Sequence, residues 1–129
     1  MKKIAFITTN KMLAQSLAAI MKDTPNLEFE PFSLLNPHQA ILDAEILKID
    51  TAVVDIQGID GASKETETIL SFFKTLRQTI PKCRLMLIVP QDNKEGRKTA
   101  IKAMKNKLID DFVFYDTSLD YLFAKLIAL

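Results

Sequence analysis

The sequence predicts an α/β fold in which helices cover both faces of a doubly wound sheet of five parallel strands. Segments typical of strands alternate five times with segments whose apolar residues have helical spacing. The segments between the strands are long enough for the right-handed crossovers that join parallel strands. Residues 4–7 and 85–89 are continuously apolar, which is typical of strands that are buried on both faces.

The first two strands differ in their expected exposure. The first covers residues 4–7, and Thr9 or Asn10 can cap the helix that follows it. The buried face of this helix is predicted to contain Leu13, Leu17, Ile20 and Met21. Residues 27–30 alternate between apolar and acidic types and precede Pro31, so this strand is expected at an edge of the sheet.

The middle of the chain contains a helix, the third strand and a second helix. Asn36 and Pro37 are typical of a helix start, and the buried face of this helix is predicted to contain Ile41, Leu42, Ile46 and Ile49. Residues 51–54 form the third strand. Ser63 is expected to cap a long helix that ends before Pro81. Its buried face is predicted to contain Ile69, Phe72, Phe73, Leu76 and Ile80.

The last part of the chain repeats this arrangement. Residues 85–89 form the fourth strand, and Asp92 or Asn93 is expected to cap a helix. The buried residues of that helix are predicted to be Ala100, Ile101, Met104 and Leu108. The fifth strand covers residues 112–115. Together these elements indicate the three-layer, flavodoxin-like strand order 2-1-3-4-5, with a core that includes Ile4, Phe6, Val53, Leu87, Ile88 and Val113.

A final helix follows the fifth strand, and Thr117 with Asp120 has the spacing of the capping box that would open it.

Composition limits the kind of protein further. The 129 residues suit a single domain over 1–129, and the net charge of +1 does not indicate direct nucleic-acid binding. No apolar run is long enough to span a membrane, and the single cysteine excludes an internal disulfide. We therefore expect a cytoplasmic protein.

Asp55 is the most site-like residue of the sequence. It directly follows the buried strand 51–54, and Gly58 and Gly61 mark the loop beyond it. In α/β sheets, ligands bind in the crevice beyond the carboxyl ends of the strands, where the strand order reverses. That point lies between the first and third strands, so Asp55 is expected to share a crevice with Thr8, Thr9 and Asn10.

This layout, with an aspartate at the end of the third strand, resembles the receiver (CheY-like) domain of bacterial response regulators. The resemblance covers the order of elements along the whole chain. Its best local match is the stretch from Asp50 to Asp55, which is similar to the family stretch that leads to the phosphoacceptor aspartate. The resemblance therefore implies that Asp55 occupies the phosphoacceptor position and that Phe112 occupies the aromatic switch position.

The family's other functional positions hold different residues here. The acidic pair that binds magnesium in receivers falls on Thr8 and Thr9, and the switch Ser or Thr falls on Val89. The lysine that ends the fifth strand falls on Tyr115, and the proline after it falls on Asp116. The resemblance thus implies a pseudo-receiver: a non-catalytic signalling or protein-interaction module without a cofactor or a resident metal.

Three alternatives remain open. The chain could be a conventional receiver that is phosphorylated on Asp55. A metal could bind at the same rim, where further oxygen ligands are expected from Asn10, Asp60, Asp92 and Asp116. The stretch Thr8 to Lys11 also resembles weakly the phosphate loop of flavodoxins, which would indicate a flavin or phosphate binder. That loop's glycine and the tryptophan for flavin stacking are absent, so no tightly bound small molecule is expected.

The opposite rim of the sheet is not expected to carry a site. Asp50, Asp110 and Asp111 precede their strands and are predicted to be solvated charges, and Cys83 lies at the same end. A protein-binding face is expected instead along the fourth helix, fifth strand and fifth helix, through a homodimer or another protein. Its predicted residues are Lys98, Lys102, Lys105, Leu122, Phe123 and Leu126. The chain is also expected to be the N-terminal domain of a longer regulatory protein or ATPase.

Overall fold

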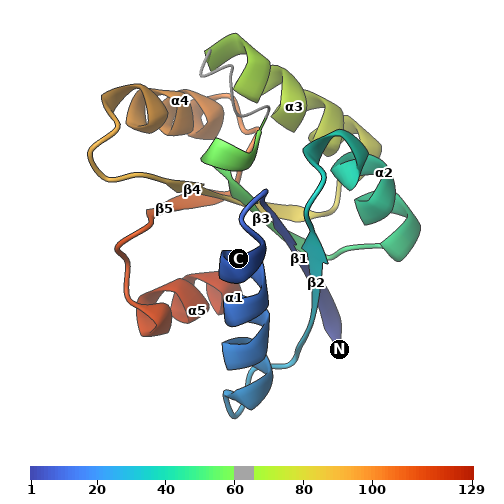
Figure 1. The fold of residues 1–129 in the computed structure, drawn as a ribbon. Coiled ribbons are helices and arrows are strands. Elements are labelled where there is room, and N and C mark those ends of the chain that lie inside the picture. Colours follow the sequence, from blue (N-terminus) through green and yellow to red (C-terminus); the bar gives the residue numbers. More distant parts are fainter. Residues whose placement is uncertain (60–65) are drawn as a thin grey trace.

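The computed structural model describes residues 1–59 and 66–129, in which five parallel strands form one sheet in the order β2-β1-β3-β4-β5 (Figure 1). The predicted fold class is therefore confirmed. The elements are β1 (Lys2–Ile7), α1 (Lys11–Asp23), β2 (Phe29–Leu34), α2 (Pro37–Leu47), β3 (Thr51–Asp55), the short 3-10 helix η1 (Ile56–Gly58), α3 (Thr66–Thr79), β4 (Arg84–Val89), α4 (Lys94–Lys105), β5 (Asp111–Phe114) and α5 (Leu119–Ala128).

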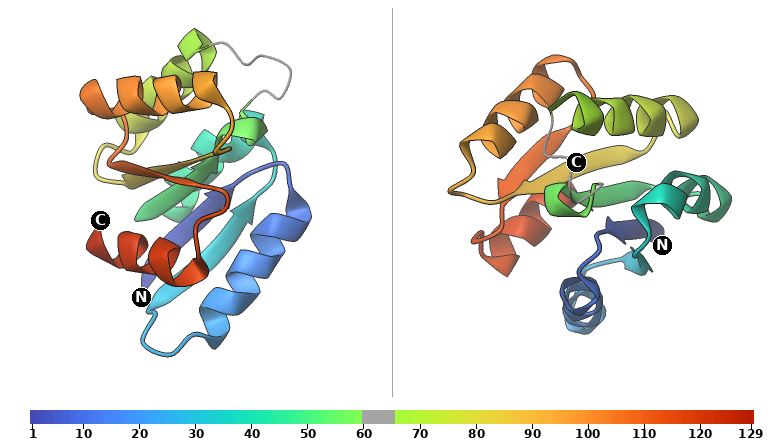
Figure 2. Two further views of the ribbon diagram at one scale, coloured as in Figure 1. Left: turned by 90° about the vertical axis from the view of Figure 1, so that its left-hand side faces the viewer. Right: turned by 45° about the horizontal axis from the view of Figure 1, so that its top comes forward.

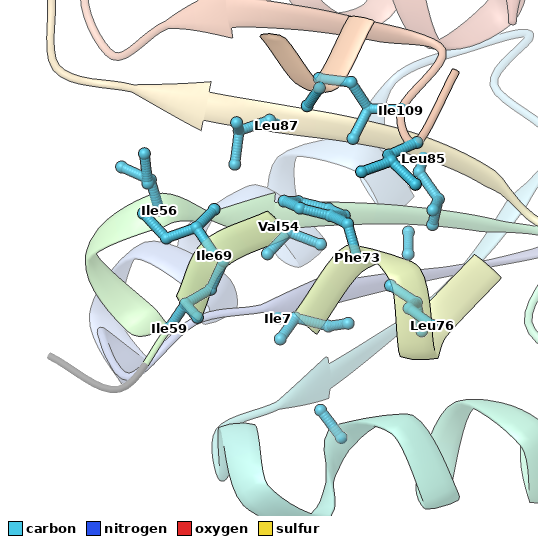
Figure 3. Close-up of a cluster of buried hydrophobic side chains, with 14 of the residues drawn as sticks. Ile7, Val54, Ile56, Ile59, Ile69, Phe73, Leu76, Leu85, Leu87 and Ile109 are labelled. Atoms are coloured by element: carbon cyan, nitrogen blue, oxygen red, sulfur yellow. The ribbon is translucent and has the colours of Figure 1, made fainter. Parts of the chain in front are cut away.

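Helices cover both faces of this sheet. One face packs against α2, α3 and α4, and the other packs against α1 and α5. Figure 2 shows α3 and α4 on one side of the strands and α1 and α5 on the other. In the first of these layers, Phe73 of α3 points at the sheet among Val54, Ile69 and Leu85 (Figure 3). The predicted core is confirmed, because Ile4, Phe6, Val53, Leu87, Ile88 and Val113 are all buried.

Asparagine side chains begin three of the helices. The side-chain oxygens of Asn10, Asn36 and Asn93 accept hydrogen bonds from amides in the first turns of α1, α2 and α4. Asn36 is the predicted cap, and Asn10 and Asn93 are each one of the two caps predicted for their helices. The predicted capping residue of α5 was wrong by one position. Ser118, not Thr117, is the cap, because its side chain accepts from the amide of Tyr121 at 3.2 Å. The predicted cap Ser63 lies outside the described residues.

The second strand lies at the sheet edge, as predicted, but it extends further than expected. It was predicted over residues 27–30, whereas β2 runs from Phe29 to Leu34 and includes Pro31, which lies opposite Ile4 of β1. A proline lacks a backbone N–H and is tolerated in a strand that pairs on one side only. The edge position therefore explains why Pro31 does not end the strand.

Several large apolar side chains that were predicted to be buried are exposed instead. They are Ile20 of α1, Leu42 and Ile46 of α2, and Ile101 of α4. In α2 the side chains that face the sheet are Ala40 and Ala44, and in α4 they include Ala100 and Ala103. Small residues let these helices lie close to the sheet and leave the large residues on the outer faces. No helix in the described part of the chain is both long and apolar enough to cross a membrane.

Candidate functional site

Asp55 ends β3 at the carboxyl-terminal rim of the sheet, and its carboxylate is enclosed by short polar contacts. Its Oδ1 accepts a hydrogen bond from the backbone amide of Gln57 at 3.0 Å, so Asp55 caps η1. Its Oδ2 accepts a hydrogen bond from the hydroxyl of Thr8 at 2.8 Å. The residue is only 5% exposed. Both carboxylate oxygens therefore have a neutral donor within the protein.

Thr8 connects this carboxylate to the end of β1. Its hydroxyl donates to Asp55, and the same oxygen accepts from the backbone amide of Asn10 at 3.0 Å. Its own amide donates to the carbonyl of Leu34 at 3.2 Å. Thr8 is buried, and its side chain supplies Asp55 with a hydrogen-bond donor.

The environment of Asp55 disfavours its ionised form. Burial raises the pKa of Asp55 above its ordinary value, and the hydrogen bonds from Thr8 and Gln57 oppose this shift only partly. None of the ion pairs formed by the described residues includes Asp55. The carboxylate is thus stabilised by two neutral dipoles and not by a neighbouring cation.

The other predicted crevice residues do not complete a charged site. Thr9 and Asn10 are exposed, and the side-chain oxygen of Asn10 accepts from the amide of Leu13, so it serves the helix cap. Val89 is fully buried in the core beneath α3 and α4. Of the predicted set, hydrogen bonds of the Thr8 hydroxyl join Asp55, Thr8 and Asn10, and a backbone hydrogen bond of 3.1 Å joins the amide of Tyr115 to the carbonyl of Val89.

The two residues after β5 have different surroundings. Tyr115 packs against the core on the face covered by α1 and α5, and its buried hydroxyl has no partner among the described residues. Asp116 is exposed, and the side-chain amide group of Gln91 lies against its carboxylate. Phe112, at the predicted aromatic switch position, is half-buried and packs edge-to-face on Phe114, with ring centroids 5.9 Å apart. Its ring is held by the core.

The donors at this rim do not fit the magnesium ion that the resemblance to receivers would imply. Magnesium is usually held through one or two carboxylates together with water molecules. Among the described residues of this rim, Asp55 has the one buried carboxylate, and both of its oxygens already accept a hydrogen bond. Within residues 1–59 and 66–129, no group of three or more His, Cys, Asp and Glu side chains could hold a metal ion. Asp60, part of the alternative metal site, lies outside the described residues.

A hollow of about 790 Å³ lies beside the site, between η1 and the first turns of α3 and α4. Ile56, Ile59 and Ile69 give it apolar walls, and Asn93 and Gly96 line it at the start of α4. Asp55 is not among its lining residues. No pattern in the sequence indicates this hollow, because its walls combine short segments that are far apart in the chain.

At the opposite, amino-terminal rim of the sheet, the prediction that Asp110 is a solvated charge was wrong. Asp110 was expected to be solvated, but its carboxylate lies 3.1 Å from the Arg77 guanidinium and 3.5 Å from that of Arg84. It also accepts from the amide of Leu85 at 2.8 Å. Arg77 donates further to the carbonyls of Cys83 and Leu108, at 2.7 Å and 3.3 Å. This network joins the end of α3 to the starts of β4 and β5.

The two other aspartates of this rim are also engaged. Asp50 accepts from the backbone amide of Lys3 at 2.8 Å, and Asp111 accepts from the ammonium of Lys125 at 2.8 Å. The hydrogen bond to Asp111 raises the pKa of Lys125. Burial raises the pKa of Cys83 to about 12, which keeps the thiol protonated and unreactive at neutral pH. Asp110 and Asp111 are therefore half-buried members of ion pairs, which corrects the prediction for these two residues, whereas Asp50 is exposed, as predicted.

The prediction of a protein-binding face was wrong for its apolar residues. Leu122, Phe123 and Leu126 are 6%, 6% and 2% exposed, so they belong to the core beneath α5 and cannot form a surface stripe. They pack on the same face of the sheet as Ala14, Leu17 and Met21 of α1, and the two helices cover that face together. The basic half of the predicted face is at the surface, because Lys98, Lys102 and Lys105 of α4 are all exposed.

No protein-family model matches the chain, and no curated protein matches it in sequence. Solved structures match it over nearly its whole length. The CheY-like response regulator receiver domain protein from Methanospirillum hungatei JF-1 has a TM-score of 0.77 at 13% identity, covering 99% of this chain and 92% of that chain. The beryllofluoride-activated NtrC4 receiver domain dimer has a TM-score of 0.76 at 20% identity, covering 99% of this chain and 94% of that chain.

A putative pilus assembly protein, CpaE, from Burkholderia thailandensis E264 has the same fold. Its TM-score is 0.72 at 15% identity, and the match covers 99% of this chain and 97% of that chain. At such identities, similarity shows the fold and does not transfer a function. The chain therefore has the CheY-like receiver fold over nearly its whole length, which confirms the resemblance seen in the sequence at the level of structure.

Proposed function

We propose that this chain is a receiver-like signalling module that acts through contacts with other proteins and is not switched by phosphorylation of Asp55. The receiver fold supports a signalling role. The observation that argues against phosphorylation is the immediate surroundings of Asp55, whose oxygens accept from Thr8 and Gln57 and form no ion pair within the described residues.

The physical argument rests on charge. Phosphoryl transfer depends mainly on positioning and on stabilising negative charge by metal ions and fixed cations. At this rim the neighbouring side chain is the hydroxyl of Thr8, and the residue at the end of β4 is the apolar Val89. Loss of a single preorganised contact of this kind typically costs about 3 kcal/mol in a transition state. A phosphoryl group on Asp55 would thus be poorly compensated, and we expect regulation through binding of a partner instead.

The test is phosphorylation by a small-molecule donor. The protein is incubated with acetyl phosphate or phosphoramidate, with and without magnesium, and its intact mass is measured. We expect no stoichiometric gain of one phosphate. Magnesium-dependent labelling that disappears in Asp55→Asn would overturn the proposal and establish the alternative, a conventional receiver. That alternative is favoured by one observation, the position of Asp55 at the end of the third strand of a receiver fold.

Self-association remains part of this proposal. The NtrC4 receiver domain with the same fold is described as a dimer, and β5 is an edge strand here. Because Phe123 lies in the core, an interface through α4, β5 and α5 would use exposed residues such as Tyr121 and Ile127. Sedimentation should show a dimer at micromolar concentration that Ile127→Asp converts to a monomer. A wild-type protein that stays monomeric throughout this range would remove the dimer from the proposal.

The chain could serve as the N-terminal domain of a longer regulatory protein or ATPase. The pilus assembly protein with this fold supports such a use by analogy only.

A further inference from the structure

The outer face of α4 combines strong positive charge with one exposed apolar residue. In its 12 residues the helix has the sequence KEGRKTAIKAMK, with five cations and a single acid. The chain as a whole carries a net charge of only +1, so this charge is local. Lys94, Lys98, Ile101 and Lys105 follow one another at steps of four, three and four residues and therefore lie in one row along the helix. This row, with Arg97 and Lys102 beside it, is called the basic row below.

Ile101 is a large apolar side chain exposed on an otherwise charged surface. It is 48% exposed, although the helix has a complete inner face made by Gly96, Thr99, Ala100 and Ala103. The isoleucine is thus not needed to attach α4 to the sheet. Its neighbours one turn away in each direction are Lys98 and Lys105. An apolar side chain between cations is suited to a partner that offers both an apolar contact and negative charge.

The cations of the basic row are only weakly compensated by the described residues. Lys98 lies 3.7 Å from Glu95, and Lys102 lies 3.5 Å from Glu67 of α3. The side chains of these two glutamates are 68% and 78% exposed, so the pairs are solvated and contribute little. Among the ion pairs of the described residues, none includes Lys94, Arg97 or Lys105. The basic row therefore keeps most of its charge available for a partner.

We infer that the basic row binds an acidic amphipathic helix of another protein, whose carboxylates face the lysines and whose apolar side chains cover Ile101. This inference deepens the proposed function, on which it rests, by naming the chemistry of the partner. Charge complementarity supplies specificity and fast association, and the apolar contact supplies a centre from which water is excluded. A membrane-binding helix would need a broad apolar face, and α4 exposes one large apolar residue. Phosphate groups of a nucleic acid would make no use of Ile101.

The experiment measures binding of synthetic probes to the whole chain by fluorescence anisotropy. The main probe is a labelled 21-residue peptide of glutamate and leucine with leucines at helical spacing. A matched peptide has serine in place of every leucine, and a DNA duplex and anionic vesicles are tested in parallel. We expect saturable, micromolar binding of the glutamate–leucine peptide and about tenfold weaker binding of the glutamate–serine peptide.

Variants identify the surface. Lys98→Glu/Lys105→Glu should weaken peptide binding about tenfold or more, and Ile101→Ser should weaken it about fivefold. The control Lys11→Glu/Lys82→Glu makes the same change in net charge at exposed positions outside α4 and should bind as the wild type does. Thermal unfolding of every variant is measured first, so that a loss of folding is recognised. Ile101→Ser is expected to fold normally because the side chain is half exposed.

Three results would overturn the inference: no saturable binding of the glutamate–leucine peptide, an Ile101→Ser variant that binds as the wild type does, or an equal loss in the control. Tighter binding of the duplex or the vesicles than of the peptide would also overturn it. Phosphate labelling of Asp55 with intact peptide binding would reject only the proposed mode of regulation. Absence of both labelling and peptide binding would reject only the docking surface.

Discussion

The two rims of the sheet place their aspartates in opposite electrostatic settings. At the carboxyl-terminal rim, Asp55 is 5% exposed and accepts from a hydroxyl and a backbone amide. At the amino-terminal rim, the side chain of Asp110 is 25% exposed and lies within 3.5 Å of two guanidinium groups. The more buried carboxylate has the less charged surroundings. At the amino-terminal rim, cations hold the fold together, whereas the rim expected to carry chemistry has none in contact with its aspartate within the described residues.

This difference separates two roles for a carboxylate. Asp110 connects α3, β4 and β5 through charge-assisted hydrogen bonds, which are stronger than neutral ones. Asp55 caps a short helix and anchors the end of β1 through Thr8, using neutral donors. Mutations at the two rims should therefore affect stability and its pH dependence in different ways.

The largest expected effect is at the amino-terminal rim. Asp110→Ala removes the acceptor for Arg77 and for the amide of Leu85 and should lower the free energy of unfolding by roughly 2–3 kcal/mol. Urea unfolding followed by circular dichroism measures this change. The control Asp23→Ala, at an exposed position at the end of α1, should stay within about 0.5 kcal/mol of the wild type. Equal losses in the two variants would mean that the network has no special role.

A smaller loss is expected from Thr8→Val, which keeps the shape of the side chain and removes its hydroxyl. Asp55 then loses one donor and the amide of Asn10 loses its acceptor, so the free energy of unfolding should fall by roughly 1–2 kcal/mol. The same substitution should cost less in an Asp55→Asn background, because a neutral amide tolerates the lost donor better than a carboxylate does. Thr9→Val, at the exposed neighbour, is the matched control. Identical costs in both backgrounds would disprove the coupling between Thr8 and Asp55.

The smallest expected effect is a change in pH dependence. Burial raises the pKa of Asp55, so the native protein holds this proton more tightly than the unfolded chain does. Ionised Asp55 therefore destabilises the fold, and the wild type should gain stability relative to Asp55→Asn as the pH falls from 7 towards 3.8, the ordinary value for this group. Urea unfolding of both proteins at several pH values measures the difference. A wild type that loses stability relative to Asp55→Asn over this range would show that the charged form is favoured.

Much of the fold could be predicted because it follows from local patterns. Continuous apolar runs identified the interior strands, alternation with Pro31 identified the edge strand, and asparagines marked three helix starts. The sheet order followed from these assignments and from the handedness of crossovers. The errors arose where several residues compete for one face. Leu42 and Ile101 have the right spacing to be buried, yet alanines face the sheet in their helices.

The site could be predicted only in part. The position of Asp55 and its proximity to Thr8 followed from the strand order, and their hydrogen bond at 2.8 Å joins them. The Gln57 amide and the ion pairs of Asp110 could not be foreseen, because they depend on backbone turns and on side chains 33 residues apart, such as Arg77 and Asp110. The hollow beside η1 likewise exists only when three distant segments meet.

The most direct test of the central claim is a titration of the protein with magnesium and then with beryllofluoride, followed by amide signals in ¹H–¹⁵N NMR spectra. Beryllofluoride is an analogue of an aspartyl phosphate, and its binding would require a charge stabilisation that the described residues of this rim do not supply. We predict that the amides of Thr8, Asp55 and Gln57 show no saturable shift at millimolar magnesium, with or without beryllofluoride. Saturable, magnesium-dependent shifts of these three amides that are absent in Asp55→Asn would contradict the account.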